Sequence, residues 1–164
     1  MSPPDIGALT ARAATAADAE ALRAFRAFHP PGLWFERDAM KVLNTARRLL
    51  TEGELAEHQQ VLMFESEDKL VALALLEQEE DSLATGHVAL IAVHRGWHGS
   101  RVDGAKLSEV VLSTALEHLE RAGFIRATAY VARVHGRSKT LLERLDFKYE
   151  SLIDGSYELH AVDF

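Results

Sequence analysis

The segment that most constrains the fold is a strongly apolar run that a glycine-containing loop joins to a long amphipathic pattern. Residues 87–93, HVALIAV, are almost continuously apolar, as is typical of a strand buried on both faces. The loop that follows contains Gly96, Gly99 and Gly104. Apolar residues then recur at helical spacing: Leu107, Val110, Val111, Ala115, Leu116 and Leu119. Gly123 can close this helix, because glycine readily adopts the left-handed conformation. The segment therefore predicts a buried strand followed by a long helix.

The first part of the chain predicts a short strand and a helix. Residues 8–14 form an extended stretch, and Thr15 and Asp18 follow in the pattern of a capping box. The apolar face of the expected helix consists of Ala21, Leu22, Phe25 and Phe28. The segment HPPG at 29–32 is expected to end this helix, since proline cannot continue one.

The other elements follow from the same two periodicities. A second helix is predicted over 36–52, where Met40, Leu43, Ala46, Leu49 and Leu50 recur at three- and four-residue spacing. Strands at 60–65 and 69–78 are joined by a tight turn. After the long helix we expect a strand at 125–131, a helix at 136–145 that carries Leu141, Leu142 and Leu145, and a hairpin of 147–154 and 156–164 around Gly155. The predicted order is βααβββαβαββ, in a single α/β domain spanning residues 1–164.

Length and composition exclude several classes of protein. The chain of 164 residues and 18.1 kDa has the size of one domain. It contains no cysteine, which excludes disulfides, thiolate metal sites and a cysteine nucleophile. No apolar stretch approaches the roughly 20 residues of a spanning helix, and the first residues lack the apolar block of a signal peptide. We therefore expect a cytoplasmic protein that does not bind membranes.

The charge pattern argues against nucleic acid as a partner. The net charge is −7, which disfavours binding to polyanions. Acids concentrate at 52–81, whereas bases outnumber acids at 94–148. A locally basic stretch in an acidic protein is compatible with a small anionic ligand, and an unevenly charged solvated surface is the alternative.

The loop after residue 93 has features of a phosphate site. Its glycines allow positive φ and a close approach of the backbone to a ligand. The first N–H groups of the following helix lack internal partners at the positive end of the helix dipole, so this corner can hold a phosphate. An ordinary strand-to-helix turn is the alternative. The loop lacks the P-loop lysine and the glycine spacing of dinucleotide-binding folds. Neither nucleoside triphosphate hydrolysis nor dinucleotide binding is therefore favoured.

With these elements in place, the sequence resembles the GNAT superfamily of acyl-CoA-dependent N-acyltransferases. The resemblance rests on the element order, the strand ending in IAVHRGWHG (91–99), the long helix, and HGRSKTLLERLDFKYES (135–151). LLERLDF (141–147) matches the family ending Leu-Tyr-Glu-Lys-Leu-Gly-Phe in five of seven places if Arg144 replaces lysine. The resemblance covers most of the chain. It implies a mixed, mostly antiparallel sheet of six to seven strands flanked by helices on both faces.

The resemblance also implies acetyl-CoA, or another acyl-CoA, as cosubstrate. Its pantetheine chain would lie beside Ile91, Ala92 and Val93. Its pyrophosphate would meet the segment made of Gly99, Ser100, Arg101, Val102, Asp103, Gly104 and Ala105. His98 and Arg101 depart from the family pattern, in which an arginine or glutamine and a glycine are usual. Asp103 brings an acid near the phosphates, and we expect it to act instead as the N-cap of the long helix.

The catalytic residues are less clearly specified. Leu142 occupies the position of the family tyrosine that protonates the leaving thiolate, and Ser138, Tyr130 or a water is expected to replace it. His87 is the candidate base, since histidine titrates near neutrality. His135 stands where the family often has asparagine, and we expect it to contact the pantetheine or relay a proton. Solvent-exposed or core histidines are the alternative readings. His94 and His98 lack an obvious third ligand, so no metal site is predicted.

The acceptor is expected to bind near the first two helices. Phe28, Trp34 and Phe35 are candidates for the lining of its pocket, with core packing as the alternative. The acidic stretch at 52–81 favours a cationic amine such as a polyamine, an aminoglycoside or a lysine side chain. The predicted activity is transfer of an acetyl or other acyl group from acyl-CoA to a primary amine of a small molecule or protein. The alternative is a noncatalytic domain of the same fold that binds acyl-CoA or a partner. A third interpretation is that the fold carries unrelated chemistry. We also expect a homodimer that forms through the C-terminal strands.

Overall fold

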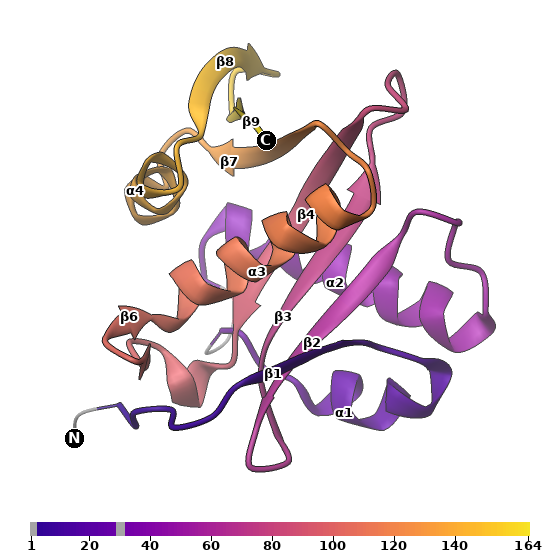
Figure 1. Cartoon of the computed structure of the whole chain (residues 1–164), viewed down its shortest axis with the longest axis vertical. Coiled ribbons are helices and arrows are strands. Elements are labelled where there is room, and N and C mark those ends of the chain that lie inside the picture. Colours follow the sequence, from indigo (N-terminus) through magenta and orange to yellow (C-terminus); the bar gives the residue numbers. More distant parts are fainter. Residues whose placement is uncertain (1–2, 29–31) are drawn as a thin grey trace.

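Seven strands form one mixed sheet in the computed structural model, which describes residues 3–28 and 32–164 (Figure 1). The strand order is β1-β2-β3-β4-β7-β9-β8, and every neighbouring pair is antiparallel except the parallel pair β4 and β7. The strands are β1 (Thr10–Ala13), β2 (Gln60–Ser66), β3 (Lys69–Gln78), β4 (Thr85–Val93), β7 (Arg126–Ala132), β8 (Lys148–Ile153) and β9 (Tyr157–Asp163). The predicted mixed, mostly antiparallel sheet is confirmed.

Helices cover both faces of this sheet. In Figure 1, α3 (Leu107–Arg121) crosses in front of the strands, whereas α1 (Ala19–Ala24) and α2 (Trp34–Glu52) lie behind them. The last helix, α4 (Gly136–Arg144), follows β7. The predicted element order is confirmed, with two additions between β4 and α3. These are a 3₁₀ turn, η2 (Arg95–Trp97), and a small hairpin of β5 (Arg101–Val102) and β6 (Ala105–Lys106). None of the helices in residues 3–28 and 32–164 combines the length and the apolar character needed to cross a bilayer.

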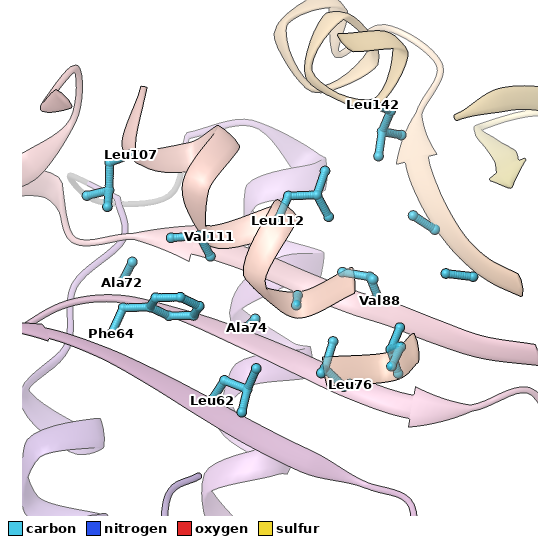
Figure 2. Close-up of a cluster of buried hydrophobic side chains, with 14 of the residues drawn as sticks. Leu62, Phe64, Ala72, Ala74, Leu76, Val88, Leu107, Val111, Leu112 and Leu142 are labelled. Carbon is cyan, nitrogen blue, oxygen red and sulfur yellow. The ribbon is translucent and has the colours of Figure 1, made fainter. Parts of the chain in front are cut away.

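The face under α3 is a continuous apolar core (Figure 2). Leu107, Val111 and Leu112 of α3 are at most 1% exposed, because the helix presents one apolar stripe to the strands. They pack in one cluster with strand residues that include Leu62, Phe64, Ala72, Ala74, Leu76 and Val88. Leu142 of α4 belongs to the same cluster. The predicted faces of both helices are therefore confirmed except at Val110, which is outside the cluster, and Leu112 joins the cluster without having been predicted. Gly123 has a φ of +98° just after α3, as its predicted closing role requires.

The face under α2 has its own apolar core. Leu43 and Leu50 of α2 pack with Leu22, Phe25 and strand residues from β2, β3 and β4. The end of α1 differs from the prediction, because the helix stops at Ala24 and residues 29–31 of HPPG lie outside the described residues. Phe25 is extended, with φ −66° and ψ 132°, and both it and Ala27 are buried. Residues two apart share a face only in extended chain, so burying both ends the helix early. Ala21 is exposed rather than part of the apolar face.

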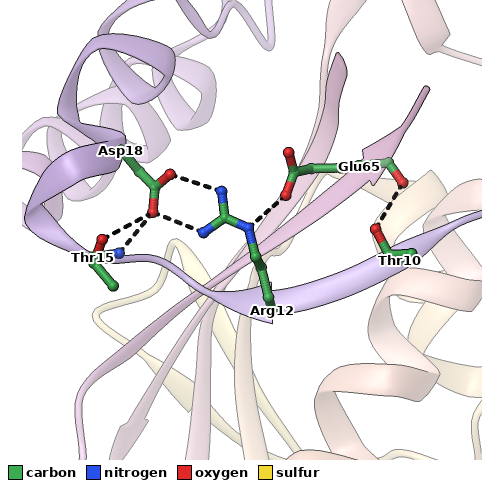
Figure 3. Close-up of polar contacts among 5 residues, drawn as sticks. All are labelled: Thr10, Arg12, Thr15, Asp18 and Glu65. Atoms are coloured by element: carbon green, nitrogen blue, oxygen red, sulfur yellow. Dashed lines mark hydrogen bonds and ion pairs between the residues drawn. The ribbon is translucent and has the colours of Figure 1, made fainter. Parts of the chain in front are cut away.

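A charged clamp ties β1 to the start of α1 (Figure 3). Two nitrogens of the Arg12 guanidinium donate to the Asp18 carboxylate at 2.9 and 2.7 Å, and Nε donates to Glu65 at 2.7 Å. Asp18 also accepts the backbone N–H of Thr15 at 2.8 Å, as the predicted capping box requires. The Arg12 hydrogen bonds lower the pKa of Asp18 from 3.8 to about 2. The capped segment is a 3₁₀ turn, Ala16–Asp18, that precedes α1.

Candidate functional site

Strands β4 and β7 pair for only part of their length and then diverge. Their parallel register runs from Thr85 opposite Arg126 to Val88 opposite Ala129, and no pairing follows (Figure 1). A bulge lies at the same point, because Leu76 faces Val88 while Leu75 faces Leu90, so that Ala89 has no partner in β3. Such a bulge bends the strand that carries the extra residue. We call the divergence beyond Val88 and Ala129 the β4–β7 fork.

The fork leaves backbone groups of β4 without a strand partner. The His94 N–H donates to the Val71 carbonyl of β3 at 2.8 Å. The backbone N–H and C=O groups of successive residues in a strand point to opposite sides. Because the His94 N–H points toward β3, the backbone groups of Ala92 also face β3, and those of Ile91 and Val93 face the fork. The Val93 carbonyl is already used, since it accepts a hydrogen bond from His98 Nε2 at 2.9 Å. Of the predicted strip, Ile91 and the Val93 N–H remain available to an extended ligand.

A buried hydrogen-bonded relay lies at the apex of the fork. His87 of β4 pairs across the ladder with Thr128 of β7, and its Nδ1 lies 2.8 Å from Thr128 Oγ1. That hydroxyl in turn donates to Glu79 Oε1 at 2.5 Å. Because the hydroxyl proton is committed to the carboxylate, Thr128 Oγ1 accepts from His87 Nδ1–H. The other ring nitrogen, Nε2, is therefore left with its lone pair, as a proton acceptor requires.

The surroundings of the relay keep His87 neutral. Burial lowers the pKa of the His87 imidazole, while the charges of Glu79 and Glu77 oppose that shift. The Tyr130 ring lies 4.7 Å from the imidazole, centroid to centroid. Desolvation and the same acidic neighbours raise the pKa of the Tyr130 phenol, so this phenol holds its proton at neutral pH. The apex thus combines a neutral base with a neutral acid.

A cavity of about 460 Å³ adjoins the apex on the α2 side of the sheet. We call it the α2 cavity. Its volume is typical of small-molecule sites. Three of the lining residues lie at or beside the apex, namely His87, Ala89 and Tyr130. The rest come from α2, the segment after it, β2 and β3: Lys41, Val42, Thr45, Ala46, Leu49, Leu55, Gln59, Gln60, Val61, Leu75, Leu76 and Glu77.

Glu77 stands directly beside the candidate base. It is the cross-strand partner of His87 in the β3–β4 ladder, which places the two side chains on the same face of the sheet. No hydrogen bond or ion pair occupies the Glu77 carboxylate among the described residues. Sequence reasoning missed Glu77, Glu79 and Thr128. The alternation of the polar residues Arg126, Thr128 and Tyr130 with apolar residues along β7 was the available signal.

The other predicted catalytic and pocket residues gather elsewhere. Ser138 Oγ lies 2.9 Å from His135 Nδ1, so these two are brought together at the start of α4. His135 stacks on Phe35 at 4.5 Å, and Trp34 packs edge-on against Tyr157 of β9 at 5.4 Å. Phe28 packs against the apolar core under α2, which is the alternative that the sequence left open for it. None of these five residues (Phe28, Trp34, Phe35, His135 and Ser138) lines the α2 cavity.

The expected N-cap role of Asp103 is wrong. Asp103 and Gly104 form the two-residue turn of the β5–β6 hairpin, with φ of +49° and +84°, and Asp-Gly is a preferred sequence for such turns. The N-cap of α3 is Lys106. Arg101 and Lys106 are cross-strand partners in this hairpin. Two exposed cations therefore stand side by side where α3 begins.

Part of the predicted phosphate cradle is closed by the protein itself. The Ser100 N–H donates to Trp97 and its carbonyl accepts from the Leu107 N–H, at 3.0 and 2.9 Å. The Ser100 side chain is 1% exposed. Pro3 covers Gly99, where an added Cβ would meet Pro3 Cγ at 3.1 Å. The Val102 and Ala105 pair closes the hairpin between the cations and the turn. The groups that this corner would offer to the phosphates of an acyl-CoA are therefore the exposed cations Arg101 and Lys106, rather than a full ring of backbone amides.

The two loop histidines serve the loop itself. His94 Nδ1 accepts the Gly96 N–H at 3.2 Å, and His98 bonds to Val93 as described. Within residues 3–28 and 32–164, no three histidine, aspartate or glutamate side chains group in a way that could hold a metal ion.

Comparison with known proteins identifies solved structures that share this fold. No protein-family model and no curated protein matches the sequence, but solved structures match over nearly the whole chain. A Desulfovibrio desulfuricans protein assigned to the GNAT family of acetyltransferases is 13% identical, with 95% of this chain and 99% of that chain covered and a TM-score of 0.70. The PaiA N-acetyltransferase of Thermoplasma acidophilum, solved with coenzyme A, is 14% identical, with 96% and 99% covered and a TM-score of 0.68.

A third structure extends the comparison to a larger assembly. The dodecameric spermidine N-acetyltransferase of Vibrio cholerae is 15% identical, with 94% of this chain and 93% of that chain covered and a TM-score of 0.68. All three structures superpose on nearly the whole chain despite their low sequence identity. The chain has the fold of the GNAT-family acetyltransferases.

Proposed function

We propose that the protein is an acyl-CoA-dependent N-acyltransferase that acylates a primary amine, with acetyl-CoA as the simplest donor. The observation that carries this proposal is the apex of the fork: a neutral His87 with a free Nε2 lines the α2 cavity at the point where β4 and β7 separate. Such a base can take the proton of an ammonium that enters from the α2 side. An acyl-CoA lying along the fork would bring its thioester to the same point.

The described residues supply each proton movement of the reaction. His87 Nε2 removes a proton from the bound ammonium, and the amine nitrogen then forms a bond to the acyl carbon. The carbon–sulfur bond then breaks as the carbonyl reforms, and the leaving sulfur takes a proton from Tyr130 Oη or from water. The nitrogen of the new amide gives its second proton to the resulting phenolate or hydroxide, so that the proton on His87 is the one released. Leu142, at the position of the family tyrosine, is 6% exposed within the core and has no proton to give. The raised pKa of Tyr130 keeps a proton available for this step.

Holding the cosubstrate is the task of β4 and of the hairpin before α3. An acyl-CoA supplies the activated thioester carbon. The Ile91 backbone and the Val93 N–H offer hydrogen bonds to the amides of its pantetheine arm, as an added strand would receive them. Arg101 and Lys106 offer charge to its phosphates.

Replacing His87 by alanine tests the catalytic part. We expect kcat/KM for amine acylation to fall by about 100-fold or more, as measured by the release of the CoA thiol from acetyl-CoA. Calorimetry with CoA should give the same Kd for the variant and the parent. His58→Ala is the matched control, because His58 is exposed and outside the cavity lining. Equal thiol release by the His87 variant and the parent would rule out this base.

Neutralising the two hairpin cations tests the cosubstrate site. Arg101→Ala and Lys106→Ala should each weaken CoA binding by about tenfold, the value of one charge-assisted hydrogen bond, and the loss should shrink at high salt. Arg121→Ala at the far end of α3 is the control, since it leaves this corner unchanged. Unaltered CoA affinity in both hairpin variants would move the phosphate site away from this corner.

The alternative is a noncatalytic domain that binds acyl-CoA. The buried Leu142 favours it, because it leaves the position of the family tyrosine without a proton donor. Calorimetric binding of CoA without thiol release, across a broad panel of primary amines, would establish this alternative. Absence of any heat with CoA would exclude both functions.

A further inference from the structure

We infer that the acceptor is a monoamine, a single primary ammonium on an apolar alkyl or aryl body, rather than a polyamine, an aminoglycoside or a lysine side chain. This inference rests on the proposed function, since it names the substrate class of the same site. Two independent properties of the α2 cavity carry it: the chemistry of its walls and the number of charges in its lining.

The walls of the cavity are largely apolar. Val42, Ala46 and Leu49 of α2 face the strands across the cavity, and Leu55 follows this helix. The opposite wall is formed by the side chains of Val61, Leu75 and Ala89. An apolar body of a ligand gains free energy in proportion to the area that such walls remove from water. The uncharged polar side chains of the lining, Thr45, Gln59 and Gln60, carry no charge to balance a second ammonium, so a multiply charged body would lose more hydration than they replace.

Only one acidic side chain belongs to the described lining. Of the ten acids between residues 52 and 81, Glu77 alone lines the cavity. Glu79 lies behind the base, where it accepts the Thr128 hydroxyl. The acidic stretch therefore does not gather into a polycation site, as its composition had suggested. Lys41 is the only Lys or Arg among the lining residues that the structure describes, and it would repel a second ammonium.

The position of Glu77 fixes where the single ammonium would bind. Its carboxylate has no partner among the described residues and stands across the ladder from His87. An ammonium bound between the two would be paired with a carboxylate and would point a proton at the base. Its body would extend away from the apex, between α2 and the sheet. A second ammonium on that body would lie between apolar walls.

Binding of four small probes to the full chain, without CoA, tests this inference. Hexylamine supplies one charge on an apolar body, and 1,6-diaminohexane has the same chain with two charges. Spermidine is the polyamine, and hexan-1-ol lacks the charge. Calorimetry or ligand-observed NMR should show hexylamine binding at least tenfold more tightly than each of the other three. A diamine or spermidine that binds as tightly as hexylamine would overturn the inference.

Two variants locate the binding. Ala46→Phe fills the cavity from α2 and should abolish hexylamine binding, whereas Ala24→Phe, which adds the same ring to the exposed end of α1, should leave it unchanged. Glu77→Gln should reduce hexylamine to the affinity of hexan-1-ol without changing the affinity of the alcohol. Unchanged hexylamine binding in Ala46→Phe or Glu77→Gln, with Tm retained, would also overturn the inference.

Turnover separates failure of the inference from failure of the proposed function. Selective hexylamine binding without thiol release from acetyl-CoA, for any amine, would leave the monoamine site in place and remove the acyltransferase. Thiol release with spermidine or a lysine peptide but not with hexylamine would retain the acyltransferase and reject the monoamine.

Discussion

The two faces of the sheet differ in their packing and in the polarity of their side chains. Under α3 the apolar side chains form one filled cluster, to which Val88 of β4 and Ala127, Ala129 and Val131 of β7 contribute. Under α2 the same two strands present His87, Thr128 and Tyr130, and a cavity of about 460 Å³ remains beside them. Successive residues of a strand point to opposite faces, so each strand supplies apolar groups to one face and polar groups to the other.

This difference separates stability from chemistry within one sheet. Burying polar side chains is unfavourable unless they are hydrogen-bonded, and here Glu79 and Thr128 satisfy one nitrogen of His87 while leaving the other free. The filled face can hold the strands in place while the α2 face keeps an open volume. The arrangement predicts that equal substitutions on the two faces will have unequal effects.

The largest expected effect is on stability. Leu112→Ala on the α3 face should lower the free energy of unfolding by about 2–5 kcal/mol, because a fully buried leucine leaves a cavity. Leu49→Ala, in the wall of the α2 cavity, should lower it by about 1 kcal/mol or less, since that side chain already borders open space. Urea unfolding of both variants measures the two losses. Equal losses would show that the α2 cavity is filled in solution.

The fold was predictable from sequence because its elements are long and periodic. The apolar run at 87–93 and the spacing of Leu107, Val111 and Ala115 each specify one element almost alone. The β5–β6 hairpin was not found, since strands of two residues have no measurable period. Its Asp103-Gly104 dipeptide was a usable turn signal, but its glycine also suits a phosphate loop. Local sequence does not decide between these uses.

The site was less predictable because it depends on register. His87 was identified from its place in the apolar run, yet Thr128 is 41 residues away and reaches it only through the β4–β7 pairing. The bulge at Ala89 has no clear sequence signature. The aromatic content of 28–35 indicated packing but not its partner, and Phe35 stacks on His135 rather than facing the cavity.

A smaller effect concerns the pH dependence of the α2 face. The charge of Glu79 raises the pKa of His87 against the effect of burial. Glu79→Gln removes that charge, so the pKa of His87 should fall further. Because His87 must be neutral to accept a proton, the acidic limb of the pH profile of kcat/KM should move to lower pH. Glu80→Gln is the control, as Glu80 is exposed and does not contact the relay. An acidic limb that moves to higher pH in Glu79→Gln would contradict the relay.

The smallest expected effect is at the edge of the sheet, at residues that do not line the α2 cavity. Asp18→Asn removes the carboxylate that Arg12 holds, and it should lower Tm at pH 7 by about 1–4 °C. Glu20→Gln, on an exposed neighbour in α1, should have a smaller effect. Since the folded pKa of Asp18 is lowered from 3.8 to about 2, its contribution is complete above pH 3.8 and disappears as the pH falls through 2. The Tm difference between parent and Asp18→Asn should therefore vanish at the lowest pH at which the parent still folds. A Tm difference that persists at that pH would mean that the clamp stabilises the protein through packing rather than through charge. The Arg12–Asp18 ion pair would then not be what holds the edge of the sheet.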